Sequence, residues 1–165
     1  MLIAKRLPSD KPKKDPLFII IFSVILASIL MIYPLSYNVS GWRPLFMLMV
    51  MLFWVLCQPT WCGVWFAFAL GILSDLLFDT PLGLNALSFV TITFIVRYFT
   101  RERRLLTFSN LWVIAAFAIT AHILFMFLVQ IMSGVHFSLT RHWQPLLSSV
   151  LFWPVLYSLL QRWRI

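Results

Sequence analysis

The stretch that decides the fold is Trp61-Cys-Gly-Val-Trp-Phe-Ala-Phe-Ala-Leu-Gly-Ile-Leu-Ser-Asp75-Leu-Leu-Phe78, followed by the turn Thr80-Pro-Leu-Gly83. A helix that crosses a bilayer needs about 17–25 mostly apolar residues. This run has that length and carries a single charge, and the Pro and Gly residues after it punctuate its end. The run therefore predicts a transmembrane helix and an all-α integral membrane protein, because an isolated span must satisfy its own backbone groups.

The rest of the chain has the same apolar character. Of its 165 residues, 62% are hydrophobic and 11% are charged, and the mean hydropathy is +0.94. A soluble domain has about 45–50% apolar and about 25% charged residues. Because so few charges cannot cover a globular surface, we expect lipid to surround most of the chain.

Six apolar runs are separated by turn residues. They cover residues 17–33, 44–56, 61–78, 84–99, 109–132 and 145–160. The sequence thus predicts a basic cytoplasmic tail over 1–15 and a six-helix transmembrane domain over 16–165. The second run is short, which indicates a helix that is tilted little or that protein partly shields from lipid.

The net charge of +8 is distributed in a way that indicates topology and not nucleic-acid binding. Residues 1–15 hold five of the thirteen Lys and Arg residues, the segment 97–104 holds four and the segment 162–165 holds two. Six spans place these eleven on one side of the membrane and leave Arg43 and Arg141 on the other. Cytoplasmic loops are enriched in Lys and Arg, so both termini are predicted to be cytoplasmic.

The third run carries a ridge of small residues that ends in an acid. Gly63, Ala67, Gly71 and Asp75 recur every four residues, so they share one face of a helix. Small residues let another helix approach closely, and an ionisable group inside a span is a functional hypothesis by default. We expect this helix at the centre of the bundle, with Asp75 facing protein and satisfied by hydroxyl groups or by Arg43.

The sequence predicts no catalytic residue, no cofactor and no metal. Asp75 and Asp79 are spaced to share Mg²⁺, but the next acid, Glu102, falls on the other side of the membrane. Cys57 and Cys62 lack zinc-site spacing, and no nucleophile triad or phosphate loop occurs. A lipid-modifying enzyme that uses the two aspartates stays open, but a structural or partner-binding carboxylate is favoured.

Four short motifs follow one another along the chain: Trp42-Arg43-Pro44, Gly71-x-x-x-Asp75, Leu82-Gly83-x-x-Ala86-Leu87 and Pro145…Trp153-Pro154…Arg162. With the length, the six-span layout and the basic ends, they make the sequence resemble the rod shape-determining MreD family over essentially the whole chain. The resemblance carries over six motif residues: Arg43, Pro44, Gly71, Asp75, Leu82 and Gly83. The candidates for structural or partner-interface positions are Arg43, Pro44, Gly63, Ala67, Gly71, Asp75 and Gly83.

The resemblance implies a non-enzymatic inner-membrane subunit of the bacterial elongasome. Such a subunit binds MreC and helps to organise peptidoglycan synthesis and rod shape, with MreB, RodA and a class B penicillin-binding transpeptidase as indirect partners. It also implies a fold similar to the substrate-binding components of energy-coupling-factor (ECF) transporters. A vitamin-type substrate-binding component is therefore the alternative, with Arg43, Asp79 and Asn85 among its polar anchors. Whether the chain forms a homo-oligomer is left open.

Overall fold

The computed structural model describes residues 16–33, 40–100, 108–133 and 143–164. These residues form six α-helices, one short 3-10 helix and no strand, which confirms the all-α prediction. The elements are α1 (Pro16–Ile32), η1 (Ser40–Trp42), α2 (Phe46–Cys57), α3 (Val64–Phe78), α4 (Leu84–Thr100), α5 (Phe108–Met132) and α6 (Trp143–Arg164). The predicted tail, residues 1–15, lies outside the described residues.

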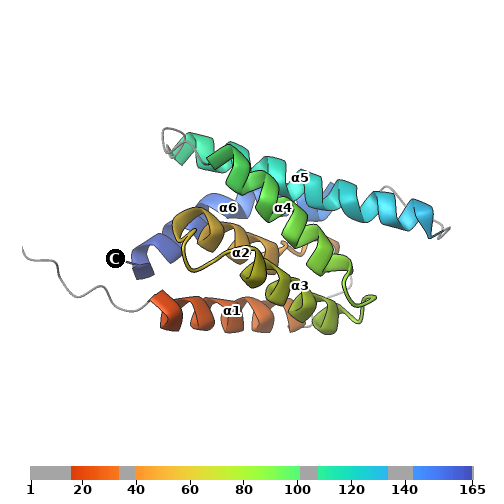
Figure 1. Cartoon of the computed structure of the whole chain (residues 1–165), viewed down its shortest axis with the longest axis horizontal. Coiled ribbons are helices and arrows are strands. Elements are labelled where there is room, and N and C mark those ends of the chain that lie inside the picture. The colour runs from red at the N-terminus through yellow and green to blue at the C-terminus, as the bar shows by residue number, and fades with distance from the viewer. Residues whose placement is uncertain (1–15, 34–39, 101–107, 134–142, 165) are drawn as a thin grey trace, which may run out of the picture.

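Consecutive helices run in opposite directions along one bundle (Figure 1). The start of α1 and the end of α6 therefore lie at the same end of the bundle, together with the end of α4. The turn between α3 and α4 lies at the opposite end. This alternation is the arrangement that short connections between antiparallel helices produce.

The centre of the bundle is α2 and not α3, so the predicted central position of the third helix is wrong. All residues from Met47 to Leu56 are buried, and α1, α3, α4, α5 and α6 all pack against this helix. In contrast, α3 exposes large side chains on one side, with Trp65 85% exposed.

The length of α2 gives a physical reason for its position. Its 12 residues measure about 18 Å, well short of a hydrocarbon layer of about 30 Å. Backbone groups at its ends would be unsatisfied in lipid, so they need surrounding protein. The neighbouring helices supply that cover, which agrees with shielding by protein, one of the two interpretations of the short second run.

The outside of the bundle is apolar on each of the longer helices. Exposed side chains include Phe18 on α1, Phe94 on α4, Leu124 on α5 and Leu151 on α6. By length and composition, residues Asn110–Met132 can cross a membrane on their own, and four further apolar helices are shorter. An apolar exterior around a filled interior is what a lipid solvent requires.

Candidate functional site

The small residues of α3 form the contact surface with α4, which is the most extensive helix pair in the bundle. Ala67 and Gly71 are buried. A Cβ atom on Gly71 would lie 2.6 Å from the backbone nitrogen of Ala86 and closer still to its Cα. At the other end of the ridge, Gly63 lies beside the side chain of Arg97. Glycine at position 71 thus permits the two backbones to touch.

Asp75 ends this ridge and is completely buried. Its Oδ1 accepts hydrogen bonds from Thr80 Oγ1 at 2.9 Å, from Asn85 N at 3.0 Å and from Asn85 Nδ2 at 2.9 Å. Its Oδ2 accepts one from Gly83 N at 2.8 Å. Both carboxylate oxygens are therefore occupied by groups of the protein itself.

Two of these donors are backbone N–H groups at the start of α4. The first N–H groups of a helix have no carbonyl partner within that helix, and the N-terminal end of the helix dipole attracts negative charge. Asp75 meets both needs from a neighbouring helix, so it acts as an N-terminal cap for α4. This role explains how an acid is accommodated between two apolar helices.

The turn between α3 and α4 depends on two residues with positive φ. Asp79 has φ 53° and ψ 37° and ends α3, with its backbone N–H bound to the carbonyl oxygen of Asp75. Gly83 has φ 100°, a conformation that favours glycine. The Asp79 side chain is exposed, and within the described residues no three His, Cys, Asp or Glu side chains gather into a metal site.

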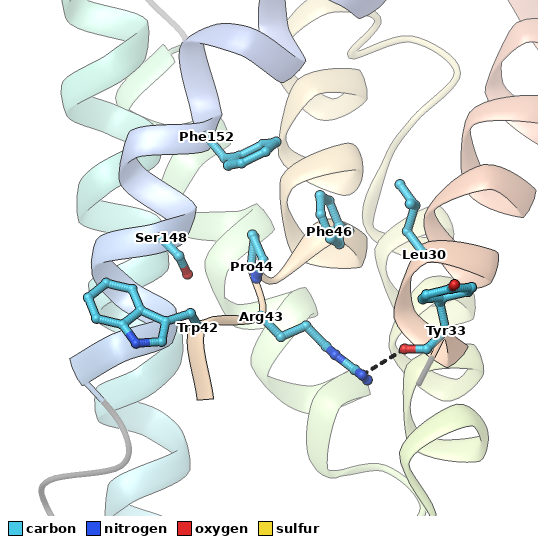
Figure 2. Close-up of a pocket in the computed structure, with 8 residues that line it drawn as sticks. All are labelled: Leu30, Tyr33, Trp42, Arg43, Pro44, Phe46, Ser148 and Phe152. Carbon is cyan, nitrogen blue, oxygen red and sulfur yellow. Dashed lines mark hydrogen bonds between the residues drawn. The ribbon is translucent and has the colours of Figure 1, made fainter. Parts of the chain in front are cut away.

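Arg43 binds the end of α1 and not Asp75, so the predicted pairing of these two residues is wrong. Its Nη1 donates to the carbonyl oxygen of Met31 at 2.6 Å. Its Nη2 donates to that of Tyr33 at 2.8 Å, the bond drawn in Figure 2. The last carbonyl groups of a helix lack partners and attract positive charge. Asp75 has no remaining need for a cation, since four donors already surround it.

The predicted second run began at Pro44, but α2 begins two residues later, so Pro44 precedes the helix. Phe46 begins the helix, and its backbone N–H bonds to the carbonyl oxygen of Pro44 at 2.9 Å. Between them, the N–H of Leu45 donates to Ser149 Oγ of α6 at 2.9 Å. The entry into α2 is thus fixed by α6.

A pocket of about 320 Å³ lies beside this entry, between α1 and α6 (Figure 2). Its lining is almost entirely apolar, with one guanidinium group at its side. The lining residues are Leu30, Tyr33, Trp42, Arg43, Pro44, Phe46, Ser148 and Phe152.

Several other buried polar side chains bind across helices, and sequence patterns did not single out Ser23 or Ser149 among them. An isolated Ser on an apolar helix is the only signal that the sequence offers, and its partner is not visible there. Three such contacts are Trp54 Nε1 to Ser23 Oγ at 2.9 Å, Ser88 Oγ to His122 Nδ1 at 2.7 Å and Thr93 Oγ1 to Met51 Sδ at 3.3 Å.

The helical bundle with its apolar exterior defines the class of all-α membrane proteins. Its residues 13–163 match the family model for rod shape-determining protein MreD, and the chain belongs to that family. Rod shape-determining protein MreD of Haemophilus influenzae is 29% identical over 154 residues, which is 89% of this chain and 91% of that protein. No solved structure matches the chain, so the likeness to ECF-transporter components stays a prediction.

Proposed function

We propose that this rod shape-determining protein is a non-enzymatic membrane subunit that binds the membrane span of MreC within the bilayer. Through that contact it helps to position peptidoglycan synthesis, with MreB, RodA and a class B transpeptidase as indirect partners. The observation that carries the proposal is the enclosure of α2, whose buried residues Met47–Leu56 fill the interior of the bundle. A partner span can then bind only on the outside.

The exterior offers the chemistry that such a partner needs. Helices in lipid associate by close packing and by hydrogen bonds, since lipid tails are as apolar as leucine. Outward-facing aromatic side chains on α3 and α4, such as Trp65 and Phe94, provide large contact areas. The polar groups of α3 are used internally, as the bonds of Asp75 illustrate.

The proposed setting is the inner membrane, with six spans and both termini in the cytoplasm. The alternating helices support this topology, as does the position of Arg97 and Arg162 at the end of the bundle where α1 begins. Cytoplasmic ends of spans carry most Lys and Arg residues.

Site-directed photo-crosslinking in cells tests the proposal. A photoreactive residue replaces one outward side chain on each of five helices, and buried Leu52 serves as the matched control. The positions are Ile25, Trp65, Phe94, Leu124 and Leu151, all exposed in the bundle. We expect adducts with MreC from one face, none from Leu52, and loss of rod shape when the gene is deleted. Normal shape after deletion together with no MreC adduct at any position would overturn the proposal.

The vitamin-binding alternative lacks a specific observation in its favour. Three of its proposed anchors have other places in the structure: Arg43 binds α1, Asn85 binds Asp75, and Asp79 is exposed in the turn. The other three, His136, Arg141 and His142, lie outside the described residues. Stabilisation of the purified chain against heat by a vitamin would favour it over a scaffold role.

A further inference from the structure

The pocket between α1 and α6 has a polar end and an apolar end. Tyr33 directly follows α1 and is 66% exposed, and Trp42 ends η1 and is 44% exposed. Tyr and Trp at span ends mark the level of the lipid headgroups. Leu30 lies one helical turn before Tyr33, and Phe152 lies one turn after Ser148, so both are deeper in the bundle (Figure 2).

The polar end carries a positive charge. The guanidinium of Arg43 has five N–H groups, and the two hydrogen bonds to α1 use only two of them. Among the described residues, its Nε is the one buried side-chain nitrogen or oxygen without a hydrogen-bond partner. The hydrogen bond from Nη2 to Tyr33 is exposed, so the Nη2 side of the guanidinium can reach a ligand.

The pocket volume suits part of a lipid. Small-molecule pockets measure about 300–1,000 Å³, and 320 Å³ lies at the lower end of that range. Its nearly wholly apolar lining excludes a sugar or a nucleotide, which would need several polar anchors. A chain of methylene groups needs none, and it gains the dispersion contacts that an unfilled pocket lacks.

We propose that this pocket binds one acyl chain of an anionic glycerophospholipid, with the lipid phosphate held by Arg43. An arginine recognises phosphate through charge-assisted hydrogen bonds. The order of groups along the pocket matches the lipid: the cation lies beside the interfacial aromatics, and the apolar lining lies one turn deeper. A bound lipid would bridge α1 and α6 at the outer end of the bundle.

Lipid retention by the purified full chain tests the proposal. The protein is titrated in detergent with phosphatidylglycerol, and with diacylglycerol that has the same acyl chains, and bound lipid is counted by native mass spectrometry. We expect phosphatidylglycerol to bind about tenfold more tightly than diacylglycerol, because only the former offers a charged partner to Arg43. Equal binding of the two would overturn phosphate recognition.

A pair of tryptophan substitutions on adjacent residues locates the site. Leu30→Trp fills the pocket and leaves Arg43 intact, whereas Ile29→Trp changes an exposed neighbour that does not line the pocket. We expect loss of bound phosphatidylglycerol in Leu30→Trp and unchanged binding in Ile29→Trp, with both variants folded. Equal retention in both variants would overturn the pocket as the site.

A third variant, Arg43→Gln, separates charge from shape. It should lower the affinity for phosphatidylglycerol about tenfold and leave that for diacylglycerol unchanged.

A photoreactive group at Phe152 in cells should yield a lipid adduct. An adduct with protein alone would show that a partner helix occupies the pocket, and would overturn the proposal.

Discussion

Asp75 shows what a buried carboxylate does in this bundle. It joins α3 to the start of α4 through donors that lie five to ten residues further along the chain. Removing an acceptor from such a network leaves several donors buried and unsatisfied, which costs more than the bonds themselves contribute. The residue is therefore a structural cap, and its loss should affect stability first.

Asp75→Asn should lower the free energy of unfolding by about 3 kcal/mol, because the amide nitrogen replaces one of the two acceptor oxygens and, with the remaining oxygen kept on Thr80 and Asn85, places its own N–H groups against the N–H of Gly83. Denaturant titration in mixed micelles measures this change. Asp79→Asn is the matched control, since that side chain is exposed and asparagine tolerates the left-handed conformation. A change of about 0.5 kcal/mol or less is expected there. Equal losses in the two variants would contradict the capping role.

At the residue scale, the sequence predicted the surroundings of Asp75 better than its partners. An acid within an apolar run has to face protein, and this much follows from its cost in lipid. A hydroxyl donor was one of the two predicted kinds of partner, and Thr80 Oγ1 supplies it. The backbone donors could not be predicted, because they meet Asp75 only when Asp79 and Gly83 adopt positive φ. Arg43 was assigned to the wrong partner for a similar reason: helix ends attract charge, and the sequence does not reveal which end lies nearby.

At the scale of helices, the close approach of α3 and α4 depends on the absence of a side chain at Gly71. A methyl group there would meet the backbone of Ala86, which cannot move independently of its helix. At Gly63, the same methyl group would lie 3.1 Å from Nη1 of Arg97, the far end of a flexible side chain. The two glycines therefore differ in what surrounds them, although they lie on one ridge.

Gly71→Ala should lower the free energy of unfolding by about 2 kcal/mol, in the range expected for overpacking. Gly63→Ala should change it by less than about 0.5 kcal/mol. The same titration in mixed micelles compares the two variants. If Gly63→Ala were the more damaging substitution, the contact between α3 and α4 would not have the geometry described here.

The helices themselves were largely predictable, whereas their packing was not. Each of the six apolar runs contains a helix, with starts or ends shifted by a few residues, as at α6, which runs on to Arg164. The ridge on α3 correctly indicated a close helix contact. The same ridge led to the wrong prediction that α3 lies at the centre. The central position of α2 could not be detected, because a helix that is buried on all sides has no periodic pattern of apolar residues.

At the scale of the molecule, charge and helix direction agree. Arg97 and Arg162 lie at the end of the bundle where α1 begins, and Arg43 lies at the other end. By the positive-inside rule, this distribution supports the proposed orientation with both termini in the cytoplasm.

Reporter fusions should measure this topology. A fluorescent reporter fused after Ile165 should fluoresce, and a phosphatase that is active only in the periplasm should be inactive at the same site. The phosphatase inserted in the turn between Asp79 and Gly83 should be active. Activity at Ile165, or inactivity at the turn, would contradict the orientation with both termini in the cytoplasm.

The enclosure of α2 also has a consequence for how the protein is made. When α2 leaves the ribosome, α1 is the only one of its five eventual neighbours that has already been synthesised. A 12-residue segment cannot remain in lipid alone with its ends unsatisfied. It therefore has to wait at the membrane surface or within the insertion machinery for later helices. Because α6 also packs against it, biogenesis of the bundle is completed only when the last helix of the chain has been translated.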